Sequence, residues 1–257
     1  SKDGKMNNFE PLRMIEQYPT KKFFFNLVKD YDDAVQIQKN WINSQKIINK
    51  DKKIRFFKTH HLFCKYGDNA FTDDANTLGV IHVVRDPRNI ISSLKHHWSL
   101  KNLEEAKKKI FDEQLMTGFK VNTNNAYSFP VMISSWANHY KAWKKIKKNY
   151  ILIKFEDLIN NPKKELHKII KYLNSIKKIE ISEDKINNIL KTTSFDNLKE
   201  LEEKGFFEEA NIDLKSNKYK SFFNTHPSQY KKTFISSGIK KEVEIKFCKE
   251  MKELGYL

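Results

Sequence analysis

The sequence predicts an α/β fold in which crossover helices join the strands of a parallel sheet. A short apolar run, a polar turn and a helix recur in that order three times, beginning near Ile54, Val80 and Tyr150. This repeated order is typical of parallel sheets, whose strands need a crossover connection. With 39% apolar residues among 257, the chain can bury a full core. Since no linker or internal repeat is visible, we expect one domain over residues 1–257.

The second apolar run is the reference point for the other elements. Residues 80–84 are rich in β-branched side chains, which predicts a strand covered on both faces. Asp86 can cap the helix that follows, and Pro87 suits its first position, because the N–H that proline lacks would be unpaired there anyway. We therefore expect the strand to end at residue 84 and the helix to begin at residue 87.

Arg85 then stands at the carboxyl end of this strand, and Ser93 lies two turns into the helix. In open α/β sheets ligands bind at that edge, and an arginine fork beside a helix N-terminus suits a phosphate. These two residues form a candidate anion site. The alternative is that Arg85 pairs with Asp86 or a neighbouring carboxylate and that Ser93 only fills space in the packing.

Upstream of the reference strand, spacing and turn residues predict four elements. We expect a short helix or loop over residues 12–18, an amphipathic helix from Asp32 or Asp33 to Ile48, a strand over residues 54–57 and a polar connection over residues 68–76. The strand over residues 54–57 ends in Lys58-Thr-His60-His61. Titratable groups therefore stand at its carboxyl end.

Downstream, the chain alternates helical and apolar segments. We expect helices over residues 103–116, 134–146, 182–190 and 239–254, the last capped near Gly255, and a strand over residues 150–153 followed by a helix from Pro162 to about Leu173. Residues 118–130 have the composition of a surface loop and of a substrate lid, and residues 199–221 are charged and weakly patterned. In the helix over residues 134–146, Trp136, His139, Tyr140 and Trp143 share one face, a pattern more typical of core packing than of a binding site.

Composition limits the classes of protein to consider. No apolar stretch is long enough to span a membrane, and the polar start at Ser1 has no signal-peptide pattern. Cys64 and Cys248 are the only cysteines, which fits a reducing cytoplasm and neither a disulfide framework nor a zinc site. The net charge of +16 favours anionic ligands or polyanions, although evenly spread lysines are typical of a solvated surface.

The chain lacks the glycine-rich phosphate loop of nucleoside-triphosphate hydrolases. His60 is the best candidate for a general base, because a neutral imidazole can accept a proton at cellular pH. His61 is an equal alternative, and both could be surface residues. Cys64 lacks the partners of a thiol nucleophile and is expected to be structural, and no metal-ligand spacing is present.

Four motifs together resemble the soluble sulfotransferases that use 3'-phosphoadenosine 5'-phosphosulfate. In chain order they are Lys58-Thr-His60, Arg85-Asp-Pro-Arg-Asn-Ile-Ile-Ser-Ser93, Phe155-Glu-Asp-Leu158 with Asn161-Pro162, and Thr193-Ser-Phe195. The resemblance covers residues 54–257, and the spacing from arginine to serine is its most specific part. It implies a three-layer sandwich of the P-loop type, with a parallel sheet flanked by helices.

The resemblance also implies a role for each motif. Arg85 and Ser93 would hold the 3'-phosphate of the cofactor, while Phe155, Thr193 and Phe195 would contact the adenine. His60 would deprotonate a hydroxyl or amine of a small-molecule acceptor, and Lys58 would lie beside the transferring sulfuryl group. No nucleic-acid partner and no metal are implied.

The sequence departs from the family pattern in three places. The first strand and its phosphosulfate-binding loop are absent, so we expect an N-terminally truncated domain that binds the cofactor poorly, turns over little and exposes unpaired strand edges. Phe155 replaces the usual tyrosine. The segment from Phe222 to His226 replaces an Arg-Lys-Gly cluster that contacts the phosphate, so Asn224, Lys231 or Lys232 would have to substitute.

One alternative belongs to another class, a basic non-catalytic module that binds nucleic acid or acidic polysaccharide. Net charge and interleaved aromatic residues favour it, but no base-stacking motif supports it. A kinase related to the P-loop enzymes is disfavoured, because Lys58-Thr-His60 has no role in phosphoryl transfer from ATP.

Overall fold

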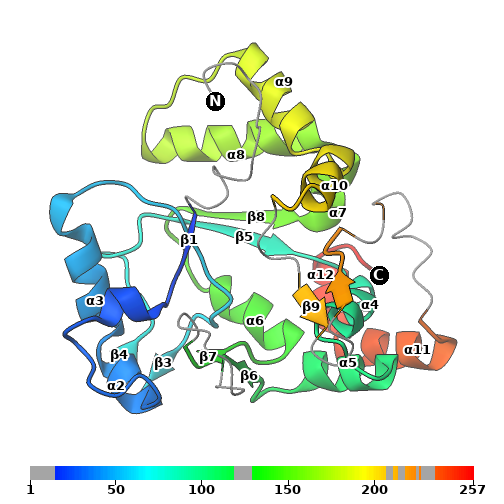
Figure 1. Cartoon of the computed structure of the whole chain (residues 1–257), viewed down its shortest axis with the longest axis horizontal. Coiled ribbons are helices and arrows are strands. Elements are labelled where there is room, and N and C mark those ends of the chain that lie inside the picture. The colour runs from blue at the N-terminus through cyan, green and yellow to red at the C-terminus, as the bar shows by residue number, and fades with distance from the viewer. Residues whose placement is uncertain (1–14, 119–128, 207–210, 214–217, 224–225, 227–234) are drawn as a thin grey trace. The chain divides into compact units, whose positions relative to one another are not determined.

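The computed structural model describes residues 15–118, 129–206, 211–213, 218–223, 226 and 235–257. These residues form two compact units. The Arg85 unit contains residues 81–108 and 151–257, and the His60 unit contains residues 15–80 and 109–150. Within the described residues, the chain therefore enters each unit twice. Figure 1 labels the elements.

The Arg85 unit is built on the strand pair β5 (Val80–Val84) and β8 (Tyr150–Lys154). Near the strand starts, the Val80 N–H donates to the Asn149 carbonyl at 2.8 Å. Just past the strand ends, the Asp86 N–H donates to the Glu156 carboxylate at 3.0 Å. Because starts meet starts and ends meet ends, the strands are parallel, as Figure 1 also shows. The strands predicted over residues 80–84 and 150–153 are thus present in an α/β arrangement, whereas the strand predicted over residues 54–57 is limited to residues 57–58.

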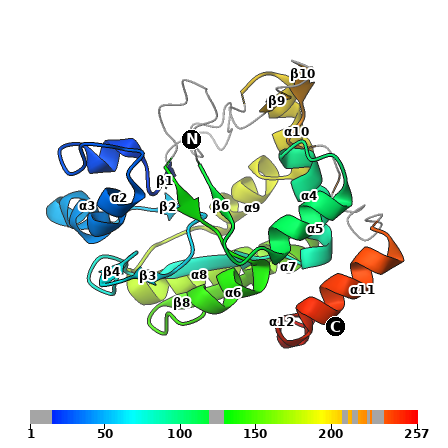
Figure 2. The same cartoon turned by 90° about the horizontal axis from the view of Figure 1, so that it is seen from below.

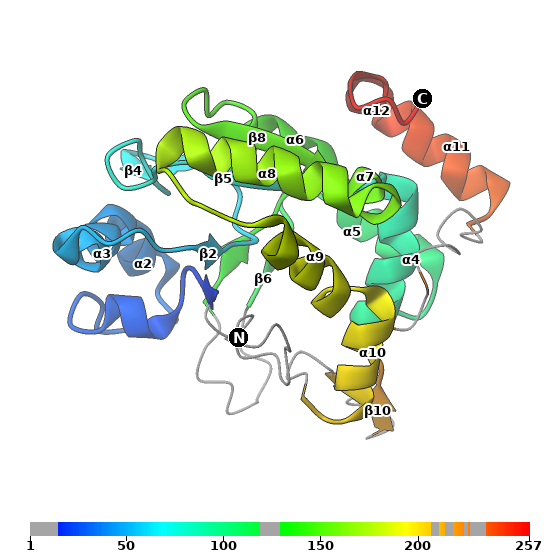
Figure 3. The ribbon, with the colours of Figure 1, turned by 90° about the horizontal axis from the view of Figure 1, so that it is seen from above.

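Helices follow both strands of this pair. They are α4 (Pro87–His97), α7 (Phe155–Asn160), α8 (Pro162–Ile176), α9 (Glu183–Thr192), α10 (Phe195–Glu203), α11 (Ser237–Lys246) and α12 (Cys248–Glu253), and the hairpin of β9 (Asn211–Asp213) and β10 (Lys218–Lys220) precedes α11. Helix α8 runs beside β8 (Figure 3), and Lys168 Nζ donates to the Leu152 carbonyl of that strand at 3.1 Å. The predicted helix start is confirmed at α4, where Asp86 accepts from the Arg88 N–H at 2.9 Å and Pro87 is the first residue.

The prediction that residues 80–84 are covered on both faces is wrong. Val84 and His82 are buried, but the Val83 side chain is 53% exposed. Alternate residues of a strand point to opposite faces. One face of β5 is therefore packed, and the other is open at Val83 within the described residues.

The His60 unit is built from short elements around an aromatic core. It contains β1 (Glu16–Gln17), the 3₁₀ helices η1 (Lys21–Phe24) and η2 (Asn49–Asp51), α2 (Ala34–Lys39), α3 (Trp41–Ile48), β2 (Phe57–Lys58), β3 (Lys65–Tyr66), β4 (Asn69–Ala70), β6 (Met116–Thr117), β7 (Val131–Met132) and α6 (Trp136–Trp143). Helix α5 (Leu103–Phe111) begins in the Arg85 unit and ends in this one. Strand β1 pairs in parallel with β2, whereas β3 with β4 and β6 with β7 are antiparallel. Figure 2 shows α2 and α3 side by side.

The core of this unit consists of the buried residues Tyr18, Phe24, Val28, Ile37, Trp41, Phe71, Phe129 and Trp143. Most are aromatic, and their rings meet edge to face, as for Trp41 with Phe71 at 5.4 Å between centroids, tilted, or stacked, as for Tyr18 with Phe24. Trp143 of α6 belongs to this core. The prediction that the aromatic face of residues 134–146 serves packing is therefore confirmed at Trp143.

Several predicted boundaries are wrong for local reasons. The described end of the expected helix or loop over residues 12–18 contains strand β1. The helix predicted over residues 32–48 is broken at Asn40, whose side-chain amide donates to the Gln36 carbonyl at 2.9 Å and competes with the backbone. The helix predicted over residues 103–116 ends at Phe111, and residues 116–117 form a strand instead.

Other differences lie in the second half of the chain. Residues 155–160, for which no helix was predicted, form α7. The weakly patterned segment starting at residue 199 lies partly in α10, which Ser194 caps. The expected C-terminal helix is two helices that meet at Phe247. Among the described residues, no helix has the length and apolar character needed to cross a bilayer.

Candidate functional site

The carboxyl ends of β5 and β8 hold the arginine of the candidate anion site. The Arg85 guanidinium lies over the Phe155 ring, with its central carbon 4.6 Å from the ring centroid. Both residues directly follow their strands, so parallel pairing brings them together. A guanidinium over an aromatic face gains a cation–π interaction and keeps its in-plane N–H groups directed sideways. Arg85 is partly exposed, so it is not sealed beneath apolar packing.

The carboxylate next to Arg85 is engaged by a different arginine. Arg88 Nη2 donates to Asp86 Oδ2 at 2.6 Å, and Arg88 Nε lies within 3.0 Å of Asp86 Oδ1. Arg88 also donates to Glu244 at 2.5 Å and to the Tyr256 carbonyl at 2.9 Å. In the structure, the Asp86 carboxylate is therefore paired with Arg88. The fork that neutralises Asp86 comes from the following helix.

Glu156 joins the ends of the two strands. It accepts from the Asp86 N–H and, at 2.9 Å, from the Tyr256 hydroxyl. Burial and the neighbouring Glu156 carboxylate raise the pKa of Tyr256 above its usual range, so this phenol is a hydrogen-bond donor at neutral pH. Lys154 Nζ donates to the Leu254 carbonyl at 3.1 Å. Hydrogen bonds thus connect residues 254 and 256 to the strand ends beside Arg85.

The other predicted cofactor residues lie on three helices of the same unit. Ser93 is exposed on α4, six residues after its first residue, or about 9 Å along the axis at ~1.5 Å per residue. Thr193 ends α9, where its hydroxyl donates to the Ile189 carbonyl at 2.7 Å. Phe195 begins α10, and its ring lies 6.0 Å from that of Phe223 and 4.9 Å from that of His226. The structure therefore groups Arg85 with Phe155, and Phe195 with the segment around residue 223.

The turn that replaces the family's Arg-Lys-Gly cluster already binds a carboxylate. Buried Glu202 accepts from the backbone N–H of Phe222 at 2.5 Å, from that of Phe223 at 3.0 Å and from the Ser221 hydroxyl at 2.8 Å. These N–H groups are the donors that such a turn could offer to an anion. Asn224, Lys231 and Lys232, the predicted substitutes, lie outside the described residues.

The predicted catalytic segment belongs to the His60 unit, where neighbouring groups hold its backbone. The Lys58 carbonyl accepts from the Tyr18 N–H at 2.9 Å. The His61 carbonyl accepts from Trp143 Nε1 at 3.0 Å, and the Leu62 N–H donates to the Met132 carbonyl at 2.7 Å. The His139 ring donates to the His60 carbonyl. Residues 58–62 are therefore positioned by three neighbouring segments, with two of the donors coming from α6.

The two adjacent histidines have different environments. His60 is exposed, whereas His61 is 2% exposed and stacks on Phe71 with 4.2 Å between ring centroids. Burial lowers the pKa of His61 to about 4, and burial lowers that of His139 to about 4 as well. Both rings are neutral at physiological pH. The sequence alone did not decide between His60 and His61 as the candidate base. The difference in exposure favours His60, because its side chain is accessible to a substrate.

Cys64 has the environment of a structural thiol. It is partly buried, and burial raises its pKa to about 11, so it is a thiol rather than a thiolate at neutral pH. Among the described residues, no group of three or more His, Cys, Asp or Glu side chains is placed to hold a metal ion.

Sequence reasoning missed the residues that position these groups. Arg88, Glu156 and Tyr256 organise the Arg85 corner, and His139 with Trp143 organises residues 58–62. The Asp-Pro-Arg order was a local signal for the Arg88 fork on Asp86. No local signal connects Arg88 or Glu156 to Tyr256, which lies 168 residues beyond Arg88.

The chain is similar to known proteins both in sequence and in structure. A family model described as "Sulfotransferase domain" matches residues 3–255. The chain is 30% identical over 157 residues to sulfotransferase 1B1 of Canis lupus familiaris, covering 60% of this chain and 47% of that protein. It is 26% identical over 165 residues to sulfotransferase 2A1 of Homo sapiens, covering 62% and 52%. The chain thus spans about half the length of these relatives.

Solved structures of similar fold include a sulfotransferase and a retinol dehydratase, each in a complex with PAP. Mouse sulfotransferase SULT7A1 complexed with PAP matches with a TM-score of 0.51 and 16% identity, over 80% of this chain and 70% of that chain. Retinol dehydratase in a complex with retinol and PAP matches with a TM-score of 0.53 and 15% identity, over 78% and 54%. At this level of identity the likeness shows the fold, and it agrees with the α/β class predicted from the sequence.

Proposed function

Because the chain belongs to the sulfotransferase-domain family, we propose that it serves the transfer of a sulfuryl group from 3'-phosphoadenosine 5'-phosphosulfate to a hydroxyl or amine of a small molecule. The observation that carries this proposal is the Arg85 corner. A partly exposed guanidinium stands at the carboxyl end of a parallel strand, and the adjacent carboxylate is already neutralised by Arg88. A phosphate would therefore meet a positive group without a competing negative one at Asp86.

The cofactor roles divide among residues of the Arg85 unit. Arg85 binds the 3'-phosphate through its fork, and the Ser93 hydroxyl adds a hydrogen bond. Phe155 holds the guanidinium plane of Arg85, while Thr193 and Phe195 contact the adenine. The second phosphate-binding cluster of the family has no counterpart in the described turn, because Glu202 takes the Phe222 and Phe223 N–H groups. Within the described residues, Arg85 is thus the charged group proposed to bind the phosphate.

The chemistry needs a base and a positive group near the sulfur. His60 takes the acceptor's proton. Its backbone is already held by the hydrogen bond from the His139 ring, so little conformational entropy is lost when the base is positioned for the reaction. Lys58, two residues earlier, stabilises the negative charge that develops on the transferring group. When bound, the donor supplies an electrophilic sulfur: the acceptor atom bonds to it as the bond from sulfur to the 5'-phosphate oxygen breaks and its electron pair leaves on that oxygen.

A binding measurement separates this proposal from a basic non-catalytic module. We expect Arg85→Ala to weaken binding of 3',5'-adenosine bisphosphate by roughly 10- to 100-fold, the effect of losing a charged hydrogen-bond partner. Arg55→Ala is the matched control, because it removes the same charge from an exposed side chain paired with Asp51. Isothermal titration calorimetry gives both affinities.

The same two variants are titrated with heparin and with single-stranded DNA. Equal, small losses of polyanion affinity in both variants, together with unchanged bisphosphate binding by Arg85→Ala, would identify the basic module and exclude the transferase. For the base, His60→Ala should abolish transfer from labelled donor while bisphosphate binding stays within about twofold. Exposed His167→Ala serves as its control.

A further inference from the structure

Buried Glu202 joins helix α10 to a turn further along the chain. The side chain is 2% exposed, and a glutamate is rarely buried so deeply unless donors satisfy its oxygens. Here three consecutive residues supply the donors: the Ser221 hydroxyl, the Phe222 N–H and the Phe223 N–H, which lie 19 to 21 residues beyond Glu202. Two of these donors are backbone groups. The carboxylate therefore fixes the path of the main chain through the turn.

The turn carries two aromatic rings that contact two different helices. The Phe223 ring lies 6.0 Å from the ring of Phe195, the first residue of α10, at an interplanar angle of 87°. The Phe222 ring lies 6.1 Å from the ring of His97, the last residue of α4, at an interplanar angle of 89°. The turn thus contacts both α10 and the helix that carries Ser93.

Glu202 and Phe195 reach the turn from one face of α10. They are seven residues apart, which is about two turns at ~3.6 residues per turn, so their side chains share a face. Glu202 accepts from the N–H of Phe223, and Phe195 contacts the ring of the same residue. Phe223 is therefore held at two points by a single helix.

Of these two contacts, the hydrogen bond to Glu202 is the stronger. An edge-to-face pair of rings contributes little by itself, whereas hydrogen bonds to a carboxylate are among the stronger ones in proteins. Because the main chain of Phe223 is fixed, its side chain is limited to a few rotamers. The place of the Phe223 ring against Phe195 therefore depends mainly on the carboxylate.

We propose that Glu202 is a positioning residue of the donor site: by binding the Phe223 N–H it holds the Phe223 ring against Phe195, the ring that contacts the adenine in the function proposed above. The inference rests on that proposed function for the adenine contact. Glu202 then acts on the base of the nucleotide, whereas Arg85 acts on the 3'-phosphate. Nucleotides with and without a 3'-phosphate should therefore depend on Glu202 equally, and only the difference between them should depend on Arg85.

Two nucleotides separate these contributions: 3',5'-adenosine bisphosphate and adenosine 5'-phosphate, each titrated into the full chain by isothermal titration calorimetry. One oxygen of Glu202 accepts from the Phe222 N–H and the other from the Phe223 N–H, so in Glu202→Gln the amide nitrogen faces a donor whichever way it turns. We expect this variant to bind both nucleotides roughly tenfold more weakly, the size of one lost contact between an aromatic ring and a base.

Two further variants frame this result. Arg85→Ala should weaken the bisphosphate alone. Glu165→Gln is the matched control, because it removes another buried carboxylate of the same unit, one paired with Lys168 on α8. It should leave both affinities within about twofold, the usual limit for a site that shares no partner with the turn.

A double-mutant cycle shows whether Glu202 acts through Phe195. Phe195→Ala should weaken both nucleotides, and Glu202→Gln should have no further effect in that background, because the ring that it positions is gone. A role in general stability predicts the same loss in both backgrounds. Phe223→Ala removes the intervening ring and keeps the carboxylate, so it should imitate Glu202→Gln and tests the proposal even if that variant does not fold.

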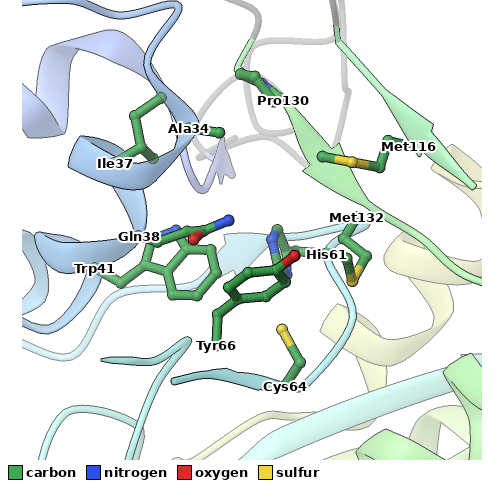
Figure 4. Close-up of a pocket in the computed structure, with 10 residues that line it drawn as sticks. All are labelled: Ala34, Ile37, Gln38, Trp41, His61, Cys64, Tyr66, Met116, Pro130 and Met132. Atoms are coloured by element: carbon green, nitrogen blue, oxygen red, sulfur yellow. The ribbon is translucent and has the colours of Figure 1, made fainter. Parts of the chain in front are cut away.

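Kinetics with labelled donor add a second readout. Glu202→Gln should raise the KM for the donor roughly tenfold and leave the KM for the acceptor unchanged. The acceptor is the internal reference, because the proposed base His60 belongs to the other unit, where its neighbour His61 lines the pocket shown in Figure 4.

Amide hydrogen exchange at Phe222 and Phe223 tests the hold on the turn without any nucleotide, and it should be roughly tenfold faster in Glu202→Gln than in Glu165→Gln. Unchanged exchange, loss of bisphosphate affinity alone, or additive effects of Glu202→Gln and Phe195→Ala would each overturn the proposal. If wild type and Glu202→Gln bind the bisphosphate equally well, this inference fails and the proposed function stands. If wild type binds neither nucleotide, the proposed function fails and the adenine role of Glu202 fails with it.

Discussion

Two buried histidines should make the stability of the His60 unit depend on pH. His61 and His139 have pKa values lowered from 6.5 to about 4, mainly by burial, so the folded protein resists their protonation while the unfolded chain does not. Above about pH 6.5 both states are neutral and the histidines have no effect. As the pH falls from about 7 to about 5, these histidines bind protons in the unfolded chain but not in the folded protein. By linkage, each histidine then lowers the free energy of unfolding by about 2 kcal/mol. Below about pH 4 the loss stops growing.

The assay is urea unfolding followed by circular dichroism at several pH values between 7 and 5. Carboxylates also respond to acid, so the informative quantity is the difference between wild type and His139→Gln, which keeps a donor for the His60 carbonyl. We expect the variant to lose about 2 kcal/mol less than wild type over this range. The exposed His167→Gln is the matched control and should follow wild type. An unchanged pH dependence in His139→Gln would refute the reasoning that burial keeps this ring neutral.

Three further predictions concern folding energetics and are checked by the same unfolding assay at neutral pH. Arg88→Met leaves the buried Asp86 carboxylate without its ionic partner and should cost about 3 kcal/mol; a loss below about 1 kcal/mol would contradict the role of the fork. Met251→Ala, at a fully buried side chain, should cost about 2–5 kcal/mol, whereas Ile245→Ala, at a side chain 68% exposed, should change stability by less than about 0.5 kcal/mol. Gly118→Ala places a Cβ 1.9 Å from the Phe129 carbonyl oxygen at a φ of +83°, whereas the Cβ of Gly67→Ala meets nothing within 4 Å at a φ of +57°. We expect Gly67→Ala to lower the free energy of unfolding by roughly 1–2 kcal/mol, and Gly118→Ala to lower it by more. Equal effects of the two variants would show that the clash relaxes.

Local signals in the sequence were sufficient to predict the elements around Arg85. A β-branched run, a capping carboxylate and a proline at the first helical position specify a strand and a helix start without any distant contact, and β5, Asp86 and Pro87 are where they were expected. The class of fold followed from the repetition of that pattern. The same signals also placed Arg85 at the strand end, which tertiary structure could not easily alter.

Features that depend on distant contacts were not predictable in this way. The break at Asn40 requires knowing that its amide finds the Leu27 carbonyl as well as its own helix. The burial of His61 next to exposed His60 depends on Trp41 and Phe71, which approach from two other segments. Periodicity records which residues share a face, but it does not record which partner covers that face.

The Arg88 fork has a consequence for synthesis of the chain on the ribosome. Arg88 contacts Glu244 and the Tyr256 carbonyl across 156 and 168 residues. At ~5–20 residues per second, Arg88 leaves the ribosome roughly 10–30 s before those partners. Residues 15–80 and 109–150 have all been made by then, so the aromatic core around Trp41 can form early. Within the segment from β5 to α4, Arg88 can pair with Asp86 at once, but its contacts with Glu244 and Tyr256 form only after the C-terminal residues have emerged.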